Sequence, residues 1–181
     1  MKLVKTQING CFELQPKIFD DERGRFVKTF NKTEFDSFEL ETRFQEQFYS
    51  VSKKNVIRGM HFQLPPFDQV KLVSCLQGAV FDAVIDLRVD SSTYGKSQTF
   101  ELTAVKANSI YIPKGLAHGF YTLSDEAVLL YNVSTVYSSE YDAGILWNSG
   151  DIVWPTLDPI LSARDQNFSS LGKFTSPFKL E

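Results

Sequence analysis

Two histidines are the residues of this chain whose type is best suited to proton chemistry. The chain has 181 residues and only these two imidazoles, and His61 lies in the run Arg58-Gly59-Met60-His61-Phe62-Gln63. Side chains of a strand alternate between its faces, so a strand here places His61 and Gln63 on one side and Met60 and Phe62 on the other. With an ordinary pKa of about 6.5, an imidazole can exchange protons at neutral pH. A single histidine is more often a packed or surface residue, so the rest of the chain must decide.

The second histidine and two acids lie in other strand-like runs. Residues 79–88 alternate between an apolar face and a face that carries Asp82 and Asp86, so we expect the polar face to line a cavity or meet water. Asp86 on its own is better explained as a turn anchor. Pro113-Lys114-Gly115 is a turn that leads His118 onto a new strand. His61, His118 and one carboxylate would also form the ligand set of a two-histidine metal centre.

The elements that position these residues are mostly strands. Short β-branched or aromatic runs between turn residues predict an all-β sandwich or barrel, and a double-sheet jelly roll fits best. Residues 4–8 form the first expected strand, and residues 70–76 and 79–88 are expected to pair as a hairpin. Short helices are expected at residues 31–38, capped by Asn31, and after Ser162.

Length and composition predict one domain that spans residues 1–181. Its hydrophobic fraction of 43% and charged fraction of 23% are ordinary for a globular protein, and 16 phenylalanines favour a β-rich core. A net charge of −3 gives no reason to expect nucleic acid, and no apolar run approaches the roughly 20 residues of a membrane span. The first residues lack a signal-peptide pattern, and Cys11 and Cys75 are too few for a disulfide framework. We therefore expect a cytoplasmic protein without nucleic-acid or membrane partners.

The order of the motifs resembles the dTDP-4-dehydrorhamnose 3,5-epimerase family of RmlC-like cupins. The resemblance runs from Ile18 to about Asp165 and rests on these motifs in chain order: Asp21-Glu22-Arg23-Gly24, the His61 run, Lys71-Leu72-Val73, residues 80–88, residues 112–120, Leu130-Tyr131, and Pro159-Ile160-Leu161-Ser162 leading to Asp165. It implies an all-β, cupin-type jelly-roll β-barrel with a short C-terminal helical region.

The resemblance also implies a reaction: cofactor-independent 3,5-epimerisation of a nucleotide-linked 4-keto-6-deoxy sugar for surface-polysaccharide synthesis. A ketone at C4 acidifies the hydrogens on C3 and C5, so a base can form an enolate and an acid can return a proton to the opposite face. The matching positions make His61 the base and Asp165 its orienting partner. Tyr131 matches the acid, and Lys71 matches the cation near the C4 oxygen. No metal and no organic cofactor is implied.

Binding residues and an oligomeric state follow from the same resemblance. Arg58 matches a contact to the diphosphate, whose oxygens suit a guanidinium. A homodimer is implied, in which residues 23–28 of one subunit reach the nucleotide site of the other. The remaining residues expected to bind substrate are Gln63, His118, Tyr137 and, in the 23–28 segment, Arg23, Phe26 and Lys28.

Two positions depart from thymidine-binding members of the family. Those members commonly carry Glu where this chain has Lys28 and Gln where it has Glu46. Lysine only donates hydrogen bonds, so Lys28 cannot accept the N–H of thymine, whereas Glu46 can accept the paired donors of guanine. Our hypothesis is that the nucleotide is GDP and that the sugar is a hexose or a heptose, as in the branch acting on GDP-linked 4-keto heptoses. A swapped surface ion pair is the alternative.

Other functions stay open at this point. A C3-only epimerase or 3,4-ketoisomerase would use the same base and pocket, although Tyr131 favours protonation on the far face. A metal-dependent cupin oxygenase is disfavoured because such cupins use His-x-His, and Gln63 replaces the second histidine here. A sugar-binding sandwich without activity is disfavoured because binding alone needs no acid and base.

Overall fold

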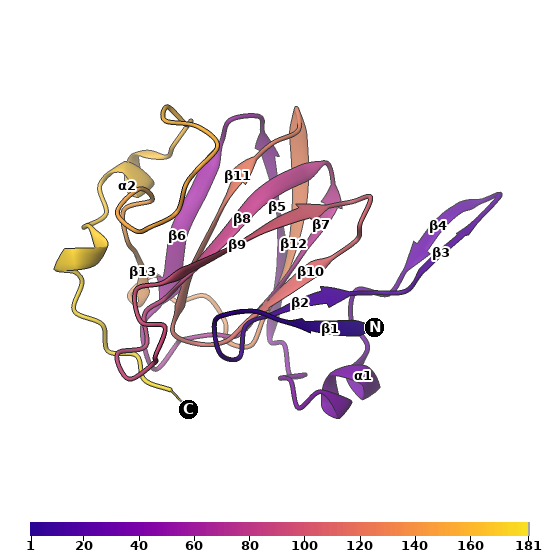
Figure 1. Cartoon of the computed structure of the whole chain (residues 1–181), viewed down its shortest axis with the longest axis horizontal. Helices are drawn as coiled ribbons and strands as arrows, with labels where there is room; N and C mark the ends of the chain where they lie inside the picture. The colour runs from indigo at the N-terminus through magenta and orange to yellow at the C-terminus, as the bar shows by residue number, and fades with distance from the viewer. Residues whose placement is uncertain (181) are drawn as a thin grey trace.

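The computed structural model describes residues 1–180, whose strands form two antiparallel sheets and one projecting hairpin (Figure 1). The first sheet has the spatial order β1 (Lys2–Lys5), β2 (Phe12–Gln15), β10 (Ser109–Ile112), β7 (Lys71–Gln77), β12 (Glu126–Val133) and β5 (Glu46–Lys53). The second has the order β13 (Asp142–Gly144), β6 (Ile57–Gln63), β11 (Leu116–Thr122), β8 (Ala79–Asp86) and β9 (Ser97–Thr103). The remaining elements are the β3 (Ile18–Asp21) and β4 (Gly24–Val27) hairpin, α1 (Lys32–Ser37), α2 (Ala163–Gln166) and the 3₁₀ helix η1 (Leu171–Lys173).

The expected all-β jelly roll of the cupin type is confirmed, with one difference. The two sheets do not close into a continuous barrel. β1 and β5 end the first sheet, and β13 and β9 end the second, so each of these four strands has a ladder neighbour on one side only. The sheets are held face to face by the side chains between them.

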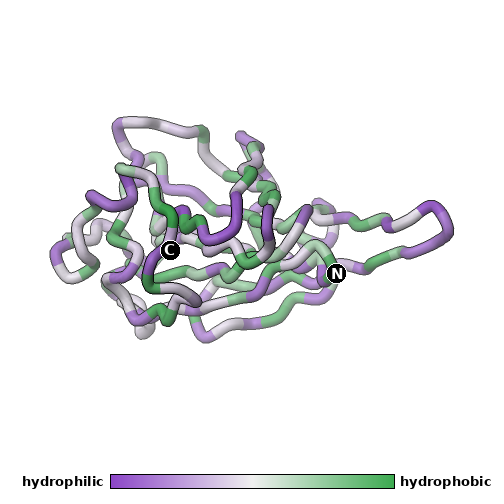
Figure 2. The backbone as a smooth tube through the Cα atoms, turned by 90° about the horizontal axis from the view of Figure 1, so that it is seen from above, coloured by the Kyte–Doolittle hydropathy of each residue, from purple (hydrophilic) through white to green (hydrophobic). Residues whose placement is uncertain are grey.

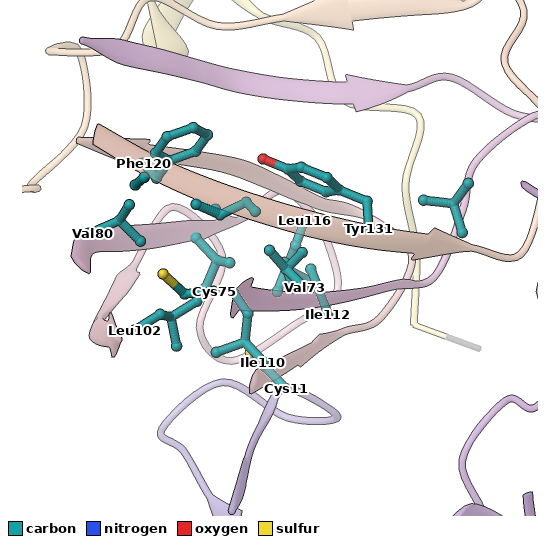
Figure 3. Packing of buried hydrophobic residues seen from close by; sticks show 14 of the residues in the cluster. Cys11, Val73, Cys75, Val80, Leu102, Ile110, Ile112, Leu116, Phe120 and Tyr131 are labelled. Atoms are coloured by element: carbon teal, nitrogen blue, oxygen red, sulfur yellow. The ribbon is translucent and has the colours of Figure 1, made fainter. Parts of the chain in front are cut away.

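The central core lies between the two sheets. Most of its residues are apolar side chains of β7, β8, β10, β11 and β12, and Figure 3 labels Val73, Val80, Leu116, Phe120 and Tyr131 among them. Burial of such side chains stabilises each by roughly 1.5–3 kcal/mol relative to exposure. Tyr131 belongs to this cluster although it carries a hydroxyl group, which places a polar atom at the margin of an apolar core.

The outer faces of both sheets are covered by other segments of the chain. Residues from Ile145 to Phe178 pack on the outer face of the second sheet, where Trp147 and Trp154 meet Phe62 and Ile85 in one cluster. The helix α1 places Phe35 against Leu14, Leu72 and Tyr111 of the first sheet. Both sheets are therefore buried on two sides over the strands that carry the candidate site.

The expected hairpin of residues 70–76 and 79–88 is wrong. β7 and β8 are consecutive but belong to different sheets, because the chain crosses from one sheet to the other at Gly78. Gly78 has a φ of +75°, and a Cβ atom there would lie 2.2 Å from the carbonyl oxygen of Glu126. Only glycine fits so close to a backbone at positive φ, so the Gln-Gly signal marks a crossover between sheets.

Both short helices are where the sequence places them, and the first strand is shorter than expected. Asn31 Oδ1 accepts the Glu34 N–H at the start of α1, and Ser162 Oγ accepts the Asp165 N–H at the start of α2. The first strand ends at Lys5, because the Thr6 hydroxyl turns the chain by bonding the Ile8 N–H. Within residues 1–180 we find no helix of the length and apolarity that crossing a bilayer requires.

The β3–β4 hairpin extends away from both sheets as an arm (Figure 1). Its tip is hydrophilic in Figure 2, whereas its stem carries Phe19 and Phe26, each 57% exposed with ring centroids 6.4 Å apart. An isolated two-stranded hairpin is marginally stable in water. The arm thus exposes an aromatic pair, and a contact with another surface would bury this pair and stabilise the hairpin.

Candidate active site

A cavity of about 300 Å³ opens between the sheets beside β6 and β12. Side chains from both sheets and from the C-terminal segment form its wall. The residues that line it are Phe48, Ser50, Arg58, His61, Phe62, Gln63, Gln69, Lys71, His118, Phe120, Tyr131, Tyr137, Asp142 and Arg164. Seven of the residues expected from the sequence meet here: His61, Lys71, Tyr131, Arg58, Gln63, His118 and Tyr137.

His61 is held by a buried carboxylate behind the cavity wall. His61 Nε2 lies 2.8 Å from Asp165 Oδ1, and the second carboxylate oxygen accepts the Gly59 N–H at 3.2 Å. Asp165 is buried because the Ser162 cap turns α2 so that its first turn faces β6. The pKa of His61 is lowered by burial, which the hydrogen bond to Asp165 partly offsets. When the Asp165 carboxylate accepts a hydrogen bond from Nε2–H, the imidazole keeps its proton on Nε2, and Nδ1 is the basic nitrogen.

Lys71 lies on β7, which belongs to the other sheet. Its ammonium group is buried and donates to the His61 carbonyl oxygen at 3.3 Å. Burial lowers the pKa of Lys71 to about 8, while the nearby carboxylates of Asp142 and Asp82 act in the opposite direction. A buried cation of this kind stabilises negative charge that develops on a substrate oxygen.

Tyr131 faces the cavity from β12, in the sheet opposite His61. Its ring stacks on Phe48 at a centroid distance of 4.8 Å and an interplanar angle of 13°. The side chain is almost fully buried, and burial raises the pKa of its hydroxyl group. Tyr131 therefore holds its proton firmly at neutral pH, as a proton donor must.

His118 forms a second pair with a carboxylate. His118 Nε2 lies 2.9 Å from Asp82 Oδ2, and both side chains are buried. The polar face of β8 was expected to line a cavity or meet water, but at Asp82 it lies inside the protein, because Asp82 is fully buried between Val80 and Val84 of the inter-sheet core. Asp86 on the same face is a turn anchor, because Arg88, Ser91 and Thr93 all donate to it.

The rim of the cavity carries charge and aromatic groups. Arg58 is fixed to the edge strand β5 by bonds from Nε to Ser52 Oγ at 2.8 Å and from its NH2 group to the Val51 carbonyl at 3.2 Å. Asp142, which also lines the cavity, accepts from the Tyr137 hydroxyl at 3.1 Å and from Arg164 at 2.8 Å. The rim thus offers two guanidinium groups and the exposed ring of Tyr137.

Two expected binding residues are already engaged by the protein. The amide of Gln63 donates to the carbonyl oxygen of Phe67 and accepts the Ser138 N–H, so it braces the loops at the cavity mouth. Glu46 lines an adjoining small pocket and accepts the Tyr137 N–H at 2.7 Å. Glu46 keeps acceptor capacity on its carboxylate, but its position is set by the Tyr137 backbone.

Arg23, Phe26 and Lys28 do not line the cavity of their own chain. Arg23 pairs with Asp21 at 2.6 Å near the tip of the arm, and Phe26 packs on Phe19. Lys28 borders a separate hollow at the base of the arm, beside Phe26 and Glu34. A role for these residues in binding substrate thus requires a second subunit.

The two histidines do not converge on one point. Each Nε2 is bonded to a different carboxylate, Asp165 for His61 and Asp82 for His118. Among the described residues 1–180, no three His, Cys, Asp or Glu side chains are grouped to hold a metal ion.

Several site residues were not identified from sequence. Phe48 lies in β5, Gln69 in the loop before β7, Asp142 at the start of β13 and Arg164 in α2, and only the whole fold brings these residues to one cavity. The sequence offered one clue to Arg164: it directly precedes Asp165 in the helix that Ser162 caps. Asp142 had none, since it lies on a three-residue strand with no pattern of its own.

Residues 5–173 match the sequence profile of the dTDP-4-dehydrorhamnose 3,5-epimerases. The chain belongs to this family. It is 42% identical over 170 residues to the dTDP-4-dehydrorhamnose 3,5-epimerase of Shigella flexneri, covering 92% of this chain and 94% of the relative. It is 39% identical to the dTDP-4-dehydrorhamnose 3-epimerase of Streptomyces niveus, covering 92% and 82%. A Legionella pneumophila 3,5-epimerase solved with dTDP-4-keto-L-rhamnose superposes with a TM-score of 0.94 at 33% identity, covering 99% of both chains.

Family membership gives the enzyme class. The chain is an isomerase that acts as an epimerase on nucleotide-linked sugars.

Proposed function

We propose that this epimerase inverts C3 and C5 of a dTDP-linked 4-keto-6-deoxy hexose through enolate intermediates. The observation that carries the proposal is the His61–Asp165 pair at 2.8 Å, which lies in the same cavity as Tyr131 of the opposite sheet. A base and an acid on opposite walls can address the two faces of a sugar ring between them. That arrangement is what inversion of a carbon requires.

In the first step, His61 Nδ1 removes the proton from the carbon next to the C4 ketone. Asp165 holds the other ring proton on Nε2, so the imidazole becomes an imidazolium whose charge Asp165 balances. The pKa of Asp165 is lowered because bonds from His61 and the Gly59 N–H outweigh burial, which acts to raise it. Asp165 therefore stays ionised while His61 carries the proton.

The electron pair that leaves the carbon moves to the C4 oxygen. Lys71 is the buried cation placed to stabilise that oxyanion, since its ammonium group lies beside His61 in the cavity. Removing one such donor costs about 3–4 kcal/mol in comparable sites. Tyr131 then gives its proton to the carbon from the other face, and the carbon is inverted.

For the nucleotide, we propose dTDP in preference to GDP. The relatives described above are named for dTDP sugars, and one was solved with such a product. The GDP hypothesis rests on Lys28 and Glu46. Lys28 lies on the arm away from the cavity, and Glu46 already accepts the Tyr137 N–H. The nucleotide diphosphate would meet Arg58 at the rim, with the Tyr137 ring beside it.

We further propose a homodimer in which the arm of one subunit completes the nucleotide site of the other. Phe19 and Phe26 are exposed on the arm, and Phe48, Tyr49 and Val51 are exposed on the edge strand β5 next to the cavity. An edge strand with exposed apolar side chains favours pairing with another strand. Seating the arm there would bring Arg23 and Lys28 to the rim.

Proton NMR in D₂O tests the proposal directly. The wild-type enzyme is offered dTDP- and GDP-linked 4-keto-6-deoxy-glucose separately, and deuterium at each sugar carbon is followed. We expect deuterium at both C3 and C5, and faster with the dTDP sugar. Faster exchange with the GDP sugar would restore the GDP hypothesis, and no exchange with either would contradict the proposed reaction.

A C3-only epimerase is the second candidate, and the Streptomyces niveus relative favours it because that protein is described as a 3-epimerase. The same base and acid would serve. Deuterium that enters C3 and never C5 in the same experiment would establish it.

A further inference from the structure

Asp82 is a buried carboxylate that the reaction described above leaves without a task. Its side chain is fully shielded from solvent, and only Oδ2 is hydrogen-bonded, to His118 Nε2 at 2.9 Å. The other oxygen, Oδ1, is buried without a hydrogen-bond partner. Buried polar atoms are normally paired, so this arrangement costs stability and calls for a functional reason.

The partner of Asp82 leads to the acid of the reaction. His118 uses Nε2 for Asp82, which leaves Nδ1 as the nitrogen available to the cavity that His118 lines. Its ring meets the Tyr131 ring edge to face, with centroids 6.2 Å apart. Asp82 is thus linked to His118 by a hydrogen bond, and His118 to Tyr131 by a ring contact.

Two inversions in one binding event create a proton deficit at Tyr131. Each inversion moves one proton from the substrate to His61 and one from Tyr131 to the substrate. His61 is 29% exposed and can release its proton to water. Tyr131 is 7% exposed, and a phenolate in that position is costly, so its proton must be replaced through the protein while substrate fills the cavity.

We propose that His118, oriented by Asp82, returns a proton to Tyr131 between the two inversions. The Nδ1–H bond of the His118 imidazolium breaks, its electron pair stays on the ring, and a new O–H bond forms on the Tyr131 phenolate. After the second inversion and the departure of product, solvent returns one proton to His118 Nδ1 and one to the Tyr131 phenolate. Asp82 is a positioning residue, which keeps the second ring proton on Nε2 and balances the imidazolium charge. This inference rests on the proposed 3,5-epimerisation.

Lys71 is also buried in the cavity, but it contacts the base His61 and not the acid Tyr131. Its ammonium group donates to the His61 carbonyl, on the side of the base. The His118 ring, by contrast, contacts the ring of Tyr131.

The test is Asp82→Asn, which keeps the shape of the side chain. Starting from the dTDP-linked 4-keto sugar in D₂O, quenched samples give the amounts of singly and doubly inverted product with time. We expect the first inversion to keep its rate within about threefold and the second to slow by at least about tenfold, so that singly inverted sugar accumulates. A purely structural role would slow both steps by the same factor.

Asp86→Asn is the matched control, because Asp86 is a buried aspartate on the same face of β8 whose partners are Arg88, Ser91 and Thr93. It should lower the melting temperature and leave the product ratio unchanged. His118→Ala gives an independent readout, since added imidazole should restore the second inversion selectively.

The outcomes separate two kinds of failure. A wild-type enzyme that puts no deuterium into either carbon contradicts the proposed function itself. An active wild-type enzyme with an unchanged product ratio in folded Asp82→Asn overturns the relay. So does imidazole that fails to change the ratio in His118→Ala.

Discussion

His61 Nε2 lies 2.8 Å from Asp165 Oδ1 although 104 residues separate the two in the chain. His61 comes from β6, an inner strand of the second sheet, and Asp165 comes from a four-residue helix near the end of the described chain. The strand β6 fixes the ring, and the Ser162 cap fixes the carboxylate. The reactivity of His61 therefore depends on how well α2 is docked against β6.

Asp165→Asn should lower kcat/KM by about 10²–10⁴-fold. The Gly59 N–H selects the amide oxygen of the new side chain, so its NH₂ group donates to His61 Nε2 and the ring proton moves to Nδ1. The nitrogen that faces substrate is then no longer basic. Steady-state kinetics give the loss. Asp158→Asn, an exposed change of equal charge near α2, is the control, and equal losses in both variants would contradict the role of Asp165.

Tyr131→Phe should uncouple exchange from inversion. The base still removes the proton, but no acid remains on the opposite face, so His61 returns a deuteron to the face it came from. In D₂O we expect deuterium at C3 or C5 of the starting sugar, with inverted product reduced by about 10²-fold or more. NMR distinguishes the labelled substrate from product. Inversion at the wild-type rate in this variant would exclude Tyr131 as the donor.

The pH profile of kcat/KM should be bell-shaped, with both limbs set by burial. His61 must be neutral to act, and burial lowers its pKa, so activity falls on acidification only below the ordinary value of 6.5. Lys71 must be charged, and its pKa of about 8 means that activity declines as the pH rises through about 8. In Lys71→Arg the cation cannot lose its proton in this range. An alkaline limb that stays near 8 in that variant would belong to another group.

The exposed aromatic residues of the arm should be needed for the dimer to form. Replacing Phe19 and Phe26 together with Ser removes the two aromatic side chains exposed on its stem. Loss of buried aromatic anchors typically weakens an interface by 1–2 kcal/mol or more each, about tenfold per 1.4 kcal/mol. We expect sedimentation to shift from dimer to monomer and KM to rise at least about tenfold. Tyr94→Ser, another exposed aromatic, is the control and should change neither. A dimer that persists with unchanged KM would refute the proposed role of the arm.

The sequence was informative wherever a residue's surroundings are local. The Asn31 and Ser162 caps marked both helices, and strand alternation grouped Asp82 with Asp86 on one face of β8. His61, Lys71 and Tyr131 could be brought together only through resemblance to a family, because no local pattern relates strands of two different sheets. The failure at Gly78 has the same cause. A Gln-Gly turn signal does not say whether the next strand pairs with its neighbour or crosses to the facing sheet.

That crossover has a further consequence for how the enzyme becomes active. Lys71 and Asp82 are eleven residues apart, yet they belong to facing sheets, so neither sheet alone can assemble the cavity. Pairings between strands distant in sequence dominate such a topology, and they make folding slow, typically milliseconds to seconds. Catalytic competence should therefore return only in the last, cooperative phase of refolding.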